Sequence, residues 1–398
     1  MAKLSIDDLK LSGKRVLVRV DFNVPLDDKL NVTDDTRIVA SIPTIKKIME
    51  SGGKTILMSH LGRPKGEVKE DMRMAPVGKR LSELIGVNVI TMRECIGPEV
   101  EKVVTAMKNG EVALLENLRF HKEEEKNIPE FAAQLARLGD VYVNDAFGTA
   151  HRAHASTEGV THYIDKCAAG YLIQKELQYL GNALDKPVRP FVAILGGAKI
   201  SDKIEVIQNL LEKVDTLIIG GGMAYTFLKA KGLEIGKSLL EEDKIELASE
   251  IMKKAKQKKI ELLLPQDNLI TTDISGNGEH KFTKGPAVPD GWLGVDIGPE
   301  TIKSFTNIIE TANTIVWNGP MGVFEVDLFS KGTIALAEAI AKRTDEGAIS
   351  VIGGGDSVAA LARAEVTDKI SHVSTGGGAS LEFLGGFKLP GIEALNER

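Results

Sequence analysis

Cysteine is scarce in this chain of 398 residues, where only Cys95 and Cys167 occur. Two cysteines exclude a disulfide framework and a zinc site built from cysteines, and they favour a reducing compartment, so we expect a cytoplasmic protein. Long apolar runs are also missing. No stretch approaches the roughly 20 residues that span a bilayer, and the first residues lack a signal-peptide core. We therefore expect no membrane partner.

An excess of positive charge is absent too, because 50 Lys and Arg face 56 Asp and Glu for a formal charge of -6. This balance gives no reason to expect a nucleic acid partner, so any anion-binding surface must be local. Two nucleotide motifs fail. Residues 53–55 and 236–238 end like a Walker A loop, but Ile48 and Lys231 replace its first glycine. No G-x-G-x-x-G opens the first strand-to-helix turn, which leaves little support for dinucleotide binding.

What the chain does contain is a regular alternation of short β-branched runs and helical patterns, typical of parallel sheets covered by helices. Its length favours two domains. A helix beginning near Ile173 and ending at Lys186 and Pro187 joins them, either as a hinge or as an ordinary core helix. Residues 273–289 are polar and aperiodic, which predicts a surface excursion. The predicted strands cover residues 15–20, 54–59, 112–116, 140–144, 191–195, 216–220, 261–264, 314–317, 349–352 and 372–374.

Arginines gather at the strand ends of the first half, where ligands of open α/β sheets bind. Their guanidinium groups form forked hydrogen bonds with phosphate and carboxylate, so this half predicts a small, multiply anionic substrate. A solvated charged face would explain any one of them alone. His151 and His154 with Asp145 are weaker metal-ligand candidates, because the residues around them fit an anion better. The motifs concerned are residues 19–25, 59–64, 116–121 and 145–152, with Arg37 between the first two.

Glycine turns mark the strand ends of the second half and predict a nucleotide site. Residues 353–357 and 375–378 both follow apolar strands, and Asp356 and Ser357 offer a carboxylate and a hydroxyl to a magnesium nucleotide. Lys199 and Lys203 lie at i and i+4, which predicts one face of a starting helix. Residues 220–225 suit a purine wall, and residues 317–325 add an amide and a carboxylate.

Together the halves predict phosphoryl transfer between separately bound substrates. A carboxylate acceptor is already ionised and needs no general base, so the protein must position the groups, neutralise charge and exclude water. Two lobes that close on a hinge would do this. Two alternatives remain: another ATP-dependent carboxylate kinase, and a nucleotide-binding interaction protein without catalysis. The presence of Arg37, Lys199 and Asp356 argues against the latter.

Five motifs, in order along nearly the whole chain, resemble the phosphoglycerate kinase family: residues 19–25, 60–64, 196–199, 317–320 and 353–357. The resemblance implies two Rossmann-like parallel-sheet domains joined by a hinge helix. It places the phosphoglycerate-binding domain at residues 1–170 plus about 389–398, the helix at 171–186 and the nucleotide-binding domain at 187–388. It also implies reversible transfer from 1,3-bisphosphoglycerate to ADP, giving 3-phosphoglycerate and ATP, with Mg²⁺, in a protein that we expect to be a monomer.

The resemblance further implies a role for individual residues. The substrate-binding positions are Asp21, Asn23, Arg37, His60, Arg63, Arg119 and Arg152. The nucleotide-binding positions are Lys199, Lys203, Gly220, Gly294, Asn318, Glu325, Gly354, Gly355, Asp356 and Ser357, with Asp356 as the metal ligand. Arg37, Lys199 and the backbone of Gly376 and Gly377 are implied to meet the transferred phosphoryl group and are the predicted catalytic residues.

Overall fold

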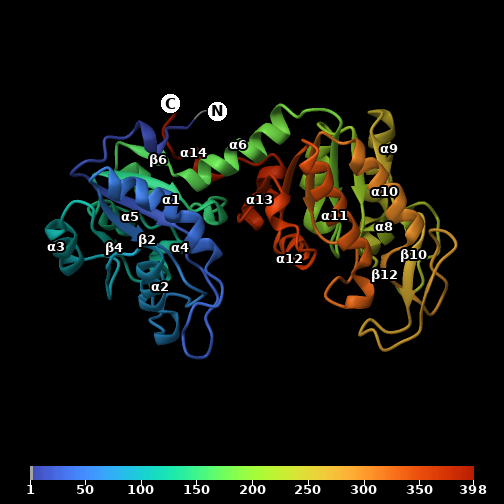
Figure 1. Ribbon diagram of the computed structural model, residues 1–398, viewed down its shortest axis with the longest axis horizontal. Helices are drawn as coiled ribbons and strands as arrows, with labels where there is room; N and C mark the ends of the chain where they lie inside the picture. The colour runs from blue at the N-terminus through green and yellow to red at the C-terminus, as the bar shows by residue number, and fades with distance from the viewer. Residues whose placement is uncertain (1–2) are drawn as a thin grey trace. The chain divides into compact units, whose positions relative to one another are not determined.

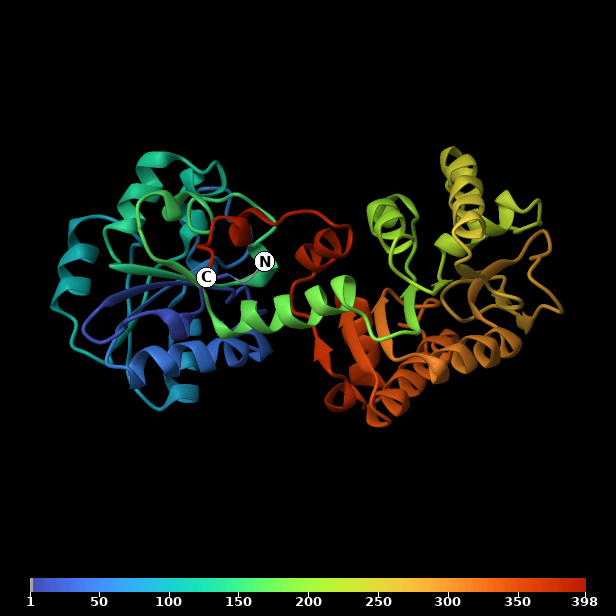
Figure 2. The same cartoon turned by 90° about the horizontal axis from the view of Figure 1, so that it is seen from above.

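A computed structural model of the protein describes residues 3–398, which form two compact units (Figure 1). The first unit runs to Leu177 and also includes Lys388–Arg398, and the second is Gln178–Phe387. The boundary falls within helix α6 (Tyr171–Asp185), drawn in green in Figure 2. None of the helices formed by residues 3–398 has both the length and the apolar character needed to cross a bilayer.

The first unit is built on a six-stranded parallel sheet in the order β3-β4-β2-β1-β5-β6. All residues of the central strand β1 after Arg15 are buried, as expected for a strand covered on both faces. The strands are β1 (Arg15–Val20), β2 (Lys54–Met58), β3 (Val89–Thr91), β4 (Val112–Leu114), β5 (Val141–Asp145) and β6 (Cys167–Ala169). The helices are α1 (Thr36–Glu50), α2 (Ala75–Ile85), α3 (Pro98–Ala106), α4 (Lys122–Glu125) and α5 (Pro129–Ala136).

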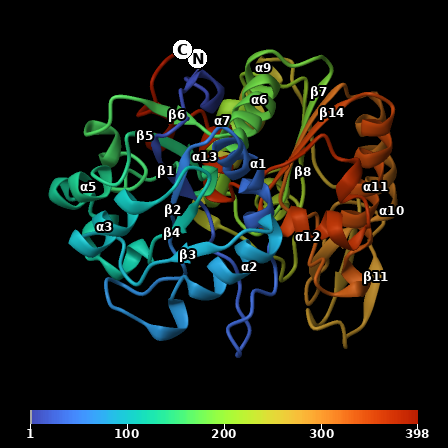
Figure 3. The ribbon, with the colours of Figure 1, turned by 60° about the vertical axis from the view of Figure 1, so that its left-hand side comes forward.

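The C-terminal segment completes this first unit. It contains α14 (Pro390–Glu393), and the carbonyl of Gly391 accepts a hydrogen bond of 2.9 Å from Nδ2 of Asn144 in β5. Lys3 and Glu397 form an antiparallel bridge, so the two ends of the described chain lie side by side (Figures 1 and 3). The first unit is therefore made of two segments that are distant in the sequence.

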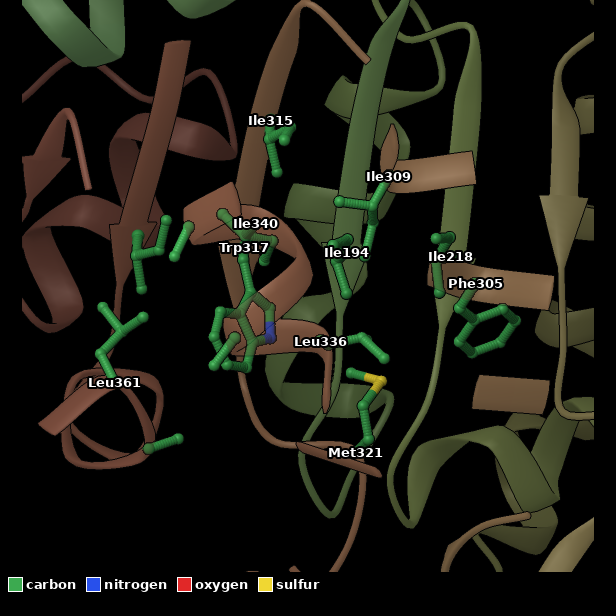
Figure 4. Packing of buried hydrophobic residues seen from close by; sticks show 14 of the residues in the cluster. Ile194, Ile218, Phe305, Ile309, Ile315, Trp317, Met321, Leu336, Ile340 and Leu361 are labelled. Atoms are coloured by element: carbon green, nitrogen blue, oxygen red, sulfur yellow. The ribbon is translucent and has the colours of Figure 1, made fainter. Parts of the chain in front are cut away.

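The second unit has its own six-stranded parallel sheet, in the order β15-β14-β13-β7-β8-β9. Its strands are β7 (Phe191–Leu195), β8 (Thr216–Ile219), β9 (Glu261–Leu263), β13 (Thr314–Asn318), β14 (Ile349–Gly353) and β15 (His372–Val373). Its helices are α7 (Ile204–Leu210), α8 (Met223–Ala230), α9 (Ile245–Gln257), α10 (Pro299–Thr311), α11 (Lys331–Asp345), α12 (Gly355–Arg363) and α13 (Gly378–Leu384). Figure 4 shows the core between sheet and helices, in which Trp317 of β13 is fully buried beside Leu336 of α11.

Residues 273–289 lie largely at the surface, as predicted, but they also contribute one strand to a small antiparallel sheet in the second unit. Its order is β11-β10-β12, formed by β10 (Asn268–Thr271), β11 (His280–Phe282) and β12 (Leu293–Ile297). Strand β11 lies inside the predicted excursion, yet all three of its residues are exposed. A strand with no buried face carries no apolar alternation, which is why the sequence pattern did not indicate it.

Each parallel sheet has one switch point, a pair of neighbouring strands from which the chain continues toward opposite edges of the sheet. In the first sheet this switch lies between β1 and β5, and in the second it lies between β7 and β13. Loops that leave the carboxyl ends of such a strand pair diverge and leave a crevice for a ligand. The predicted α/β fold with two parallel sheets is confirmed, and these two switch points determine where the site residues gather.

Candidate active site

Arg37 lies in the first turn of α1, close to the loop that leaves β1. Its Nη1 lies 3.2 Å from Oδ2 of Asp21 and 3.2 Å from the backbone carbonyl of Asn23. The Asn23 amide oxygen accepts a 2.8 Å hydrogen bond from the backbone N–H of Gly62 in the loop after β2. The structure therefore brings Asp21, Asn23 and Arg37 together and ties them to the neighbouring strand end.

His60 follows β2 and rests on Arg19, which is fully buried in β1. Arg19 donates from Nε to the Ser156 hydroxyl (2.8 Å) and from Nη1 to the Val20 carbonyl, and its Nη2 lies 3.2 Å from Nδ1 of His60. Burial, followed by the charges of the neighbouring arginines, holds the pKa of His60 well below its ordinary value. Because the guanidinium can only donate, Nδ1 accepts, and Nε2 of the neutral ring carries the hydrogen.

Arg119 and His154 complete the buried part of this cluster. Arg119 is 7% exposed, and its Nη1 donates to the Gly62 carbonyl at 3.2 Å while its Nε lies 3.3 Å from Oε1 of Glu125. Burial and the charges of Arg19, Arg119 and Arg152 lower the pKa of His154 to about 4. Nδ1 of His154 is buried and makes no hydrogen bond within residues 3–398.

The predicted residues Arg63 and Arg152 lie at the surface of the same unit. Both are exposed, and Nε of Arg152 lies 3.2 Å from Nε2 of His151. The charge of Arg152 contributes to lowering the pKa of both Arg119 and His154. We call the set Arg19, Arg37, His60, Arg119, Arg152 and His154 the basic cluster. Its positive charges exceed the carboxylates in contact with them, so it is suited to a ligand with more than one negative charge.

Two members of the basic cluster were not predicted as site residues. Arg19 lies within a predicted motif, but its inward direction depends on which face of β1 is buried. His154 was weighed only as a metal ligand together with Asp145. The Asp145 carboxyl is fully buried and accepts a 2.9 Å hydrogen bond from the backbone N–H of Leu172 in α6, so it serves the helix and not a metal site with the histidines.

In the second unit, glycine loops meet backbone to backbone at the switch point. Gly196, after β7, donates to the Asn318 carbonyl at 2.9 Å, and Gly197 donates to the Pro320 carbonyl at 3.0 Å. A Cβ atom on Gly196 would lie 2.0 Å from the Pro320 carbonyl oxygen. Glycine is therefore required here so that the strand ends can approach one another, whether or not a phosphate also binds.

Lys203 is the buried cation of this unit. Its Nζ donates to Oδ1 of Asn318, whose Nδ2 donates to the Gly353 carbonyl at 2.8 Å. Burial lowers the pKa of Lys203 to about 8, against the opposing charges of Asp202 and Asp356. Lys199 is exposed and precedes the first helical residue, Ser201 of the 3₁₀ helix η6 (Ser201–Lys203). The prediction that the two lysines share a helix face is therefore wrong.

The turn at residues 353–357 opens α12 next to this lysine. Gly354 has φ = 93°, and a Cβ atom there would lie 2.8 Å from Nδ2 of Asn318. Asp356 is exposed in the first helical turn beside Gly355. Ser357 is fully buried, and its hydroxyl accepts a 2.6 Å hydrogen bond from the backbone N–H of Gly319. Of the two predicted groups, only the carboxylate of Asp356 therefore faces outward, while the hydroxyl of Ser357 is engaged inside the protein.

The remaining predicted positions lie on neighbouring loops. A Cβ atom on Gly220 would lie 2.3 Å from Sδ of Met321, and one on Gly294 would lie 1.7 Å from the Tyr225 hydroxyl, so both glycines permit close packing. Glu325 is exposed after β13. Gly377, with φ = 52°, precedes α13, and the N–H of Gly376 donates to the Ser374 hydroxyl at 3.2 Å.

Two parallel-sheet units, one carrying a basic cluster and the other glycine loops around a buried lysine, define an α/β enzyme that handles phosphate-bearing ligands. The sequence agrees with a family assignment. The profile of the phosphoglycerate kinase family matches residues 6–387, and the chain belongs to this family.

Relatives and solved structures support this assignment over the full length. Phosphoglycerate kinases of Chlorobium phaeobacteroides and Chlorobium limicola are 58% and 59% identical over 397 residues, which is 100% of each chain. The solved phosphoglycerate kinase of Coxiella burnetii is 43% identical with a TM-score of 0.90. That of Pyrococcus horikoshii OT3 is 34% identical with a TM-score of 0.83, and in both cases 98% of each chain is covered.

The chain is therefore a transferase of glycolysis. It moves a phosphoryl group between 1,3-bisphosphoglycerate with ADP and 3-phosphoglycerate with ATP. The family and the activity predicted from the motifs are confirmed.

Proposed function

We propose that the phosphoryl group passes directly and in line from 1,3-bisphosphoglycerate to ADP, with no phosphorylated residue between them. A β-phosphate oxygen of ADP attacks the acyl phosphorus while the bond to the carboxylate oxygen breaks, so the electron pair leaves with 3-phosphoglycerate and no proton moves. The observation that carries this proposal is the basic cluster, which supplies fixed positive charge at a strand switch point but no exposed nucleophile of its own.

In the first unit, different residues are proposed to contact the unreactive phosphate, the glycerate part and the transferred phosphoryl group. We propose that neutral His60 donates from Nε2 to the phosphate that does not react, and that Arg63, Arg119 and Arg152 neutralise it. Asp21 and Asn23 bind the glycerate part and hold Arg37 by the 3.2 Å contacts already described. Arg37 is only partly buried, and we assign it to the charge of the transferred phosphoryl group.

In the second unit, the proposed nucleotide contacts surround the switch point. Lys203 and Asn318 bind the nucleotide phosphates, and exposed Lys199 meets the transferred group. The glycines at 220, 294, 354 and 355 give the nucleotide close access to backbone, and Glu325 binds the ribose. Gly376 and Gly377 offer backbone donors to the transferred group, and the Ser374 contact positions this loop. Ser357 supports the turn from inside through Gly319.

Asp356 fits a magnesium ion held together with the nucleotide. Its carboxylate is exposed at the start of α12, and its charge acts on Lys203, which places it close to the proposed phosphate contacts. Mg²⁺ in such sites takes one or two protein carboxylates, with phosphate oxygens and water filling the other positions. When bound, the ion neutralises phosphate charge; orientation of the phosphates remains the task of Lys203 and the glycine loops.

Direct transfer requires the acceptor held by one unit to reach the nucleotide held by the other, so we propose that the two substrates together draw the units into a closed state. Small-angle scattering with both substrates should give a smaller radius of gyration than with either alone, and an unchanged value would contradict closure. We further propose that the protein is cytoplasmic, because its two cysteines are free and buried. We also propose that it is a monomer, which a measurement of its mass in solution tests.

The decisive experiment for the mechanism uses ATP with a chiral γ-phosphate. Direct transfer to 3-phosphoglycerate inverts the configuration at phosphorus, whereas two successive transfers through a residue retain it. A parallel coupled assay should show ATP turnover with 3-phosphoglycerate and none with acetate. Retention would refute direct transfer, and turnover with acetate would show that the basic cluster is wrongly assigned.

A further inference from the structure

A second cluster of metal-binding residue types lies in the first unit and takes no part in the proposed mechanism. Glu94 and Cys95 follow β3, and His121 follows the 3₁₀ helix η3 (Leu118–Phe120) beyond β4. Strands β3 and β4 are neighbours in the parallel sheet, so the loops after them leave the same edge. The topology thereby brings together a carboxylate, a thiol and an imidazole from segments about 26 positions apart in the chain.

The ligand atoms of these three residues all lie within 4.8 Å of one another. Oε1 of Glu94 lies 2.7 Å from Nε2 of His121 and also accepts a 2.7 Å hydrogen bond from the backbone N–H of Cys95. The His121 ring packs against Phe131, with 5.2 Å between ring centroids, which limits its rotation. The three groups are thus held by the fold before any ion arrives.

Burial is graded across the cluster. Cys95 is completely buried, while the side chains of His121 and Glu94 are 26% and 51% exposed. Glu94 and His121 therefore lie toward solvent, and the thiol lies at the inner end of the cluster. The two outer side chains also have room to adjust.

The electrostatic surroundings favour a cation. Hydrogen bonding to Glu94 raises the pKa of His121, and the charges of Glu123 and Glu124 raise it further. Burial raises the pKa of the Cys95 thiol, and the charges of Glu94 and Glu124 raise it further, so the thiol keeps its proton until a metal ion displaces it. The charges of Glu94, Glu123 and Glu124 thus all act on His121 in the direction that favours a positive charge.

We propose that Glu94, Cys95 and His121 bind a divalent transition-metal ion of the zinc class, with water completing the coordination. A thiolate with an imidazole and a carboxylate is a donor set that Zn²⁺ prefers and that Mg²⁺ does not. On binding, the Cys95 thiol releases its proton to solvent and the sulfur forms a bond to the metal. The ion also replaces the hydrogen bond between Glu94 and His121.

The geometry requires only a small adjustment. Bond lengths of about 2.0–2.3 Å in a tetrahedral site separate the ligand atoms by roughly 3.3–3.7 Å. The Glu94 and His121 atoms must therefore move apart from 2.7 Å by less than about 1 Å. Both side chains are partly exposed, so this small movement is possible although the contact with Phe131 limits rotation of the His121 ring.

The chain offers matched controls. Glu158 and His162 form another carboxylate–imidazole pair, 2.7 Å apart. Among the described residues, this pair does not belong to a metal-binding group with a cysteine. Cys167 is a second buried cysteine, and its Sγ lies 3.0 Å from the Ile164 carbonyl. Substituting these residues tests whether any carboxylate–histidine pair or any buried thiol produces the same result.

The experiment titrates the metal-free full chain with Co²⁺ and then with Zn²⁺. One equivalent of Co²⁺ should give a thiolate-to-cobalt charge-transfer band that Zn²⁺ abolishes. Cys95→Ser should lose the band, and both Cys95→Ser and His121→Gln should weaken Zn²⁺ binding by about tenfold or more. Cys167→Ser and His162→Gln should behave like the parent chain.

Retained kinase activity in each variant shows that it is folded. Absence of the band in the parent chain would overturn the proposal, as would a band that survives Cys95→Ser or Zn²⁺ affinity within twofold of the parent in both site variants. Because the readouts are absorption and binding, failure here leaves the phosphoryl-transfer proposal untouched.

Discussion

Nη2 of the fully buried Arg19 lies 3.2 Å from Nδ1 of His60, so an arginine that cannot reach solvent fixes the hydrogen-bonding state of a histidine in the proposed substrate site. The same guanidinium is held from its other sides by Ser156 and the Val20 carbonyl. His60 therefore presents a hydrogen on Nε2 without carrying charge.

The first prediction concerns this support. Arg19→Lys keeps one positive charge but loses the fixed geometry that joins Ser156, Val20 and His60. We expect KM for 3-phosphoglycerate to rise by about tenfold or more, because a misplaced His60 weakens substrate positioning. KM for ATP should stay within twofold, and steady-state kinetics with each substrate varied in turn checks both. A parallel rise in the two KM values would show that the substitution disturbs both substrate sites and would contradict the specific role.

The second prediction concerns Arg37, whose Nη1 is held by Asp21 and the Asn23 carbonyl. Arg37→Ala should lower kcat by about 10² or more, the scale of removing one group that stabilises charge in the transition state. ADP affinity should remain largely unchanged, as measured by calorimetry. The control is Arg15→Ala, which removes a partly exposed arginine paired with Asp140 at 2.6 Å and should leave kcat within twofold. Near-parental turnover of Arg37→Ala would defeat the assigned role.

Much of the fold could be predicted because the β-branched runs of a buried parallel sheet are local features of the sequence. Each predicted strand overlaps an observed one, and β1 and β7 agree at both ends. Five strands of the described chain were missed. Strand β3 is only three residues long (Val-Ile-Thr), and β10 and β12 belong to the small antiparallel sheet. The other two carry weak patterns. Strand β6 is Cys-Ala-Ala, with no β-branched residue, and β11 is exposed throughout. Their positions depend on pairing with distant segments, which a local pattern does not contain.

The candidate site was likewise predictable only in part. Polar residues at strand ends could be identified because parallel strands bring their carboxyl ends to one edge of a sheet. The direction in which an individual side chain points could not be predicted from the sequence. Arg19 and Ser357 face inward because the surrounding sheet and loops leave them buried, and Lys199 precedes its helix because the turn after β7 continues to Ser201. The C-terminal segment beside β5 was expected from the family resemblance, and periodicity alone would not have indicated it.

The third prediction follows from the burial of Lys203, which lowers its pKa to about 8. As pH rises through this value the ammonium loses its proton and with it the attraction to a nucleotide phosphate. The dissociation constant for ADP should therefore increase about tenfold between pH 7 and pH 9. Lys203→Arg remains protonated throughout, so its ADP affinity should vary far less over the same range. Equal pH dependence in both proteins would assign the titration to another group.

The fourth prediction concerns Asp145, which accepts a hydrogen bond from the N–H of Leu172 at the start of α6 and whose second oxygen is buried without a hydrogen bond in the described chain. Burial raises its pKa from 3.8 to about 7. The folded protein thus keeps this proton up to about pH 7, while the unfolded chain releases it near pH 3.8, so the contribution to the unfolding free energy falls as pH rises across that interval.

Asp145→Asn removes this titration while keeping an oxygen that can accept from Leu172. Relative to the parent, the variant should therefore gain about 2 kcal/mol in unfolding free energy between pH 5 and pH 7. Urea unfolding of the first unit at several pH values measures the gain. The control is Asp140→Asn, because Arg15 lowers the pKa of that carboxyl and its titration falls below this range. If Asp145→Asn and its parent lose stability in parallel from pH 5 to pH 7, the buried carboxyl is already ionised in the folded protein.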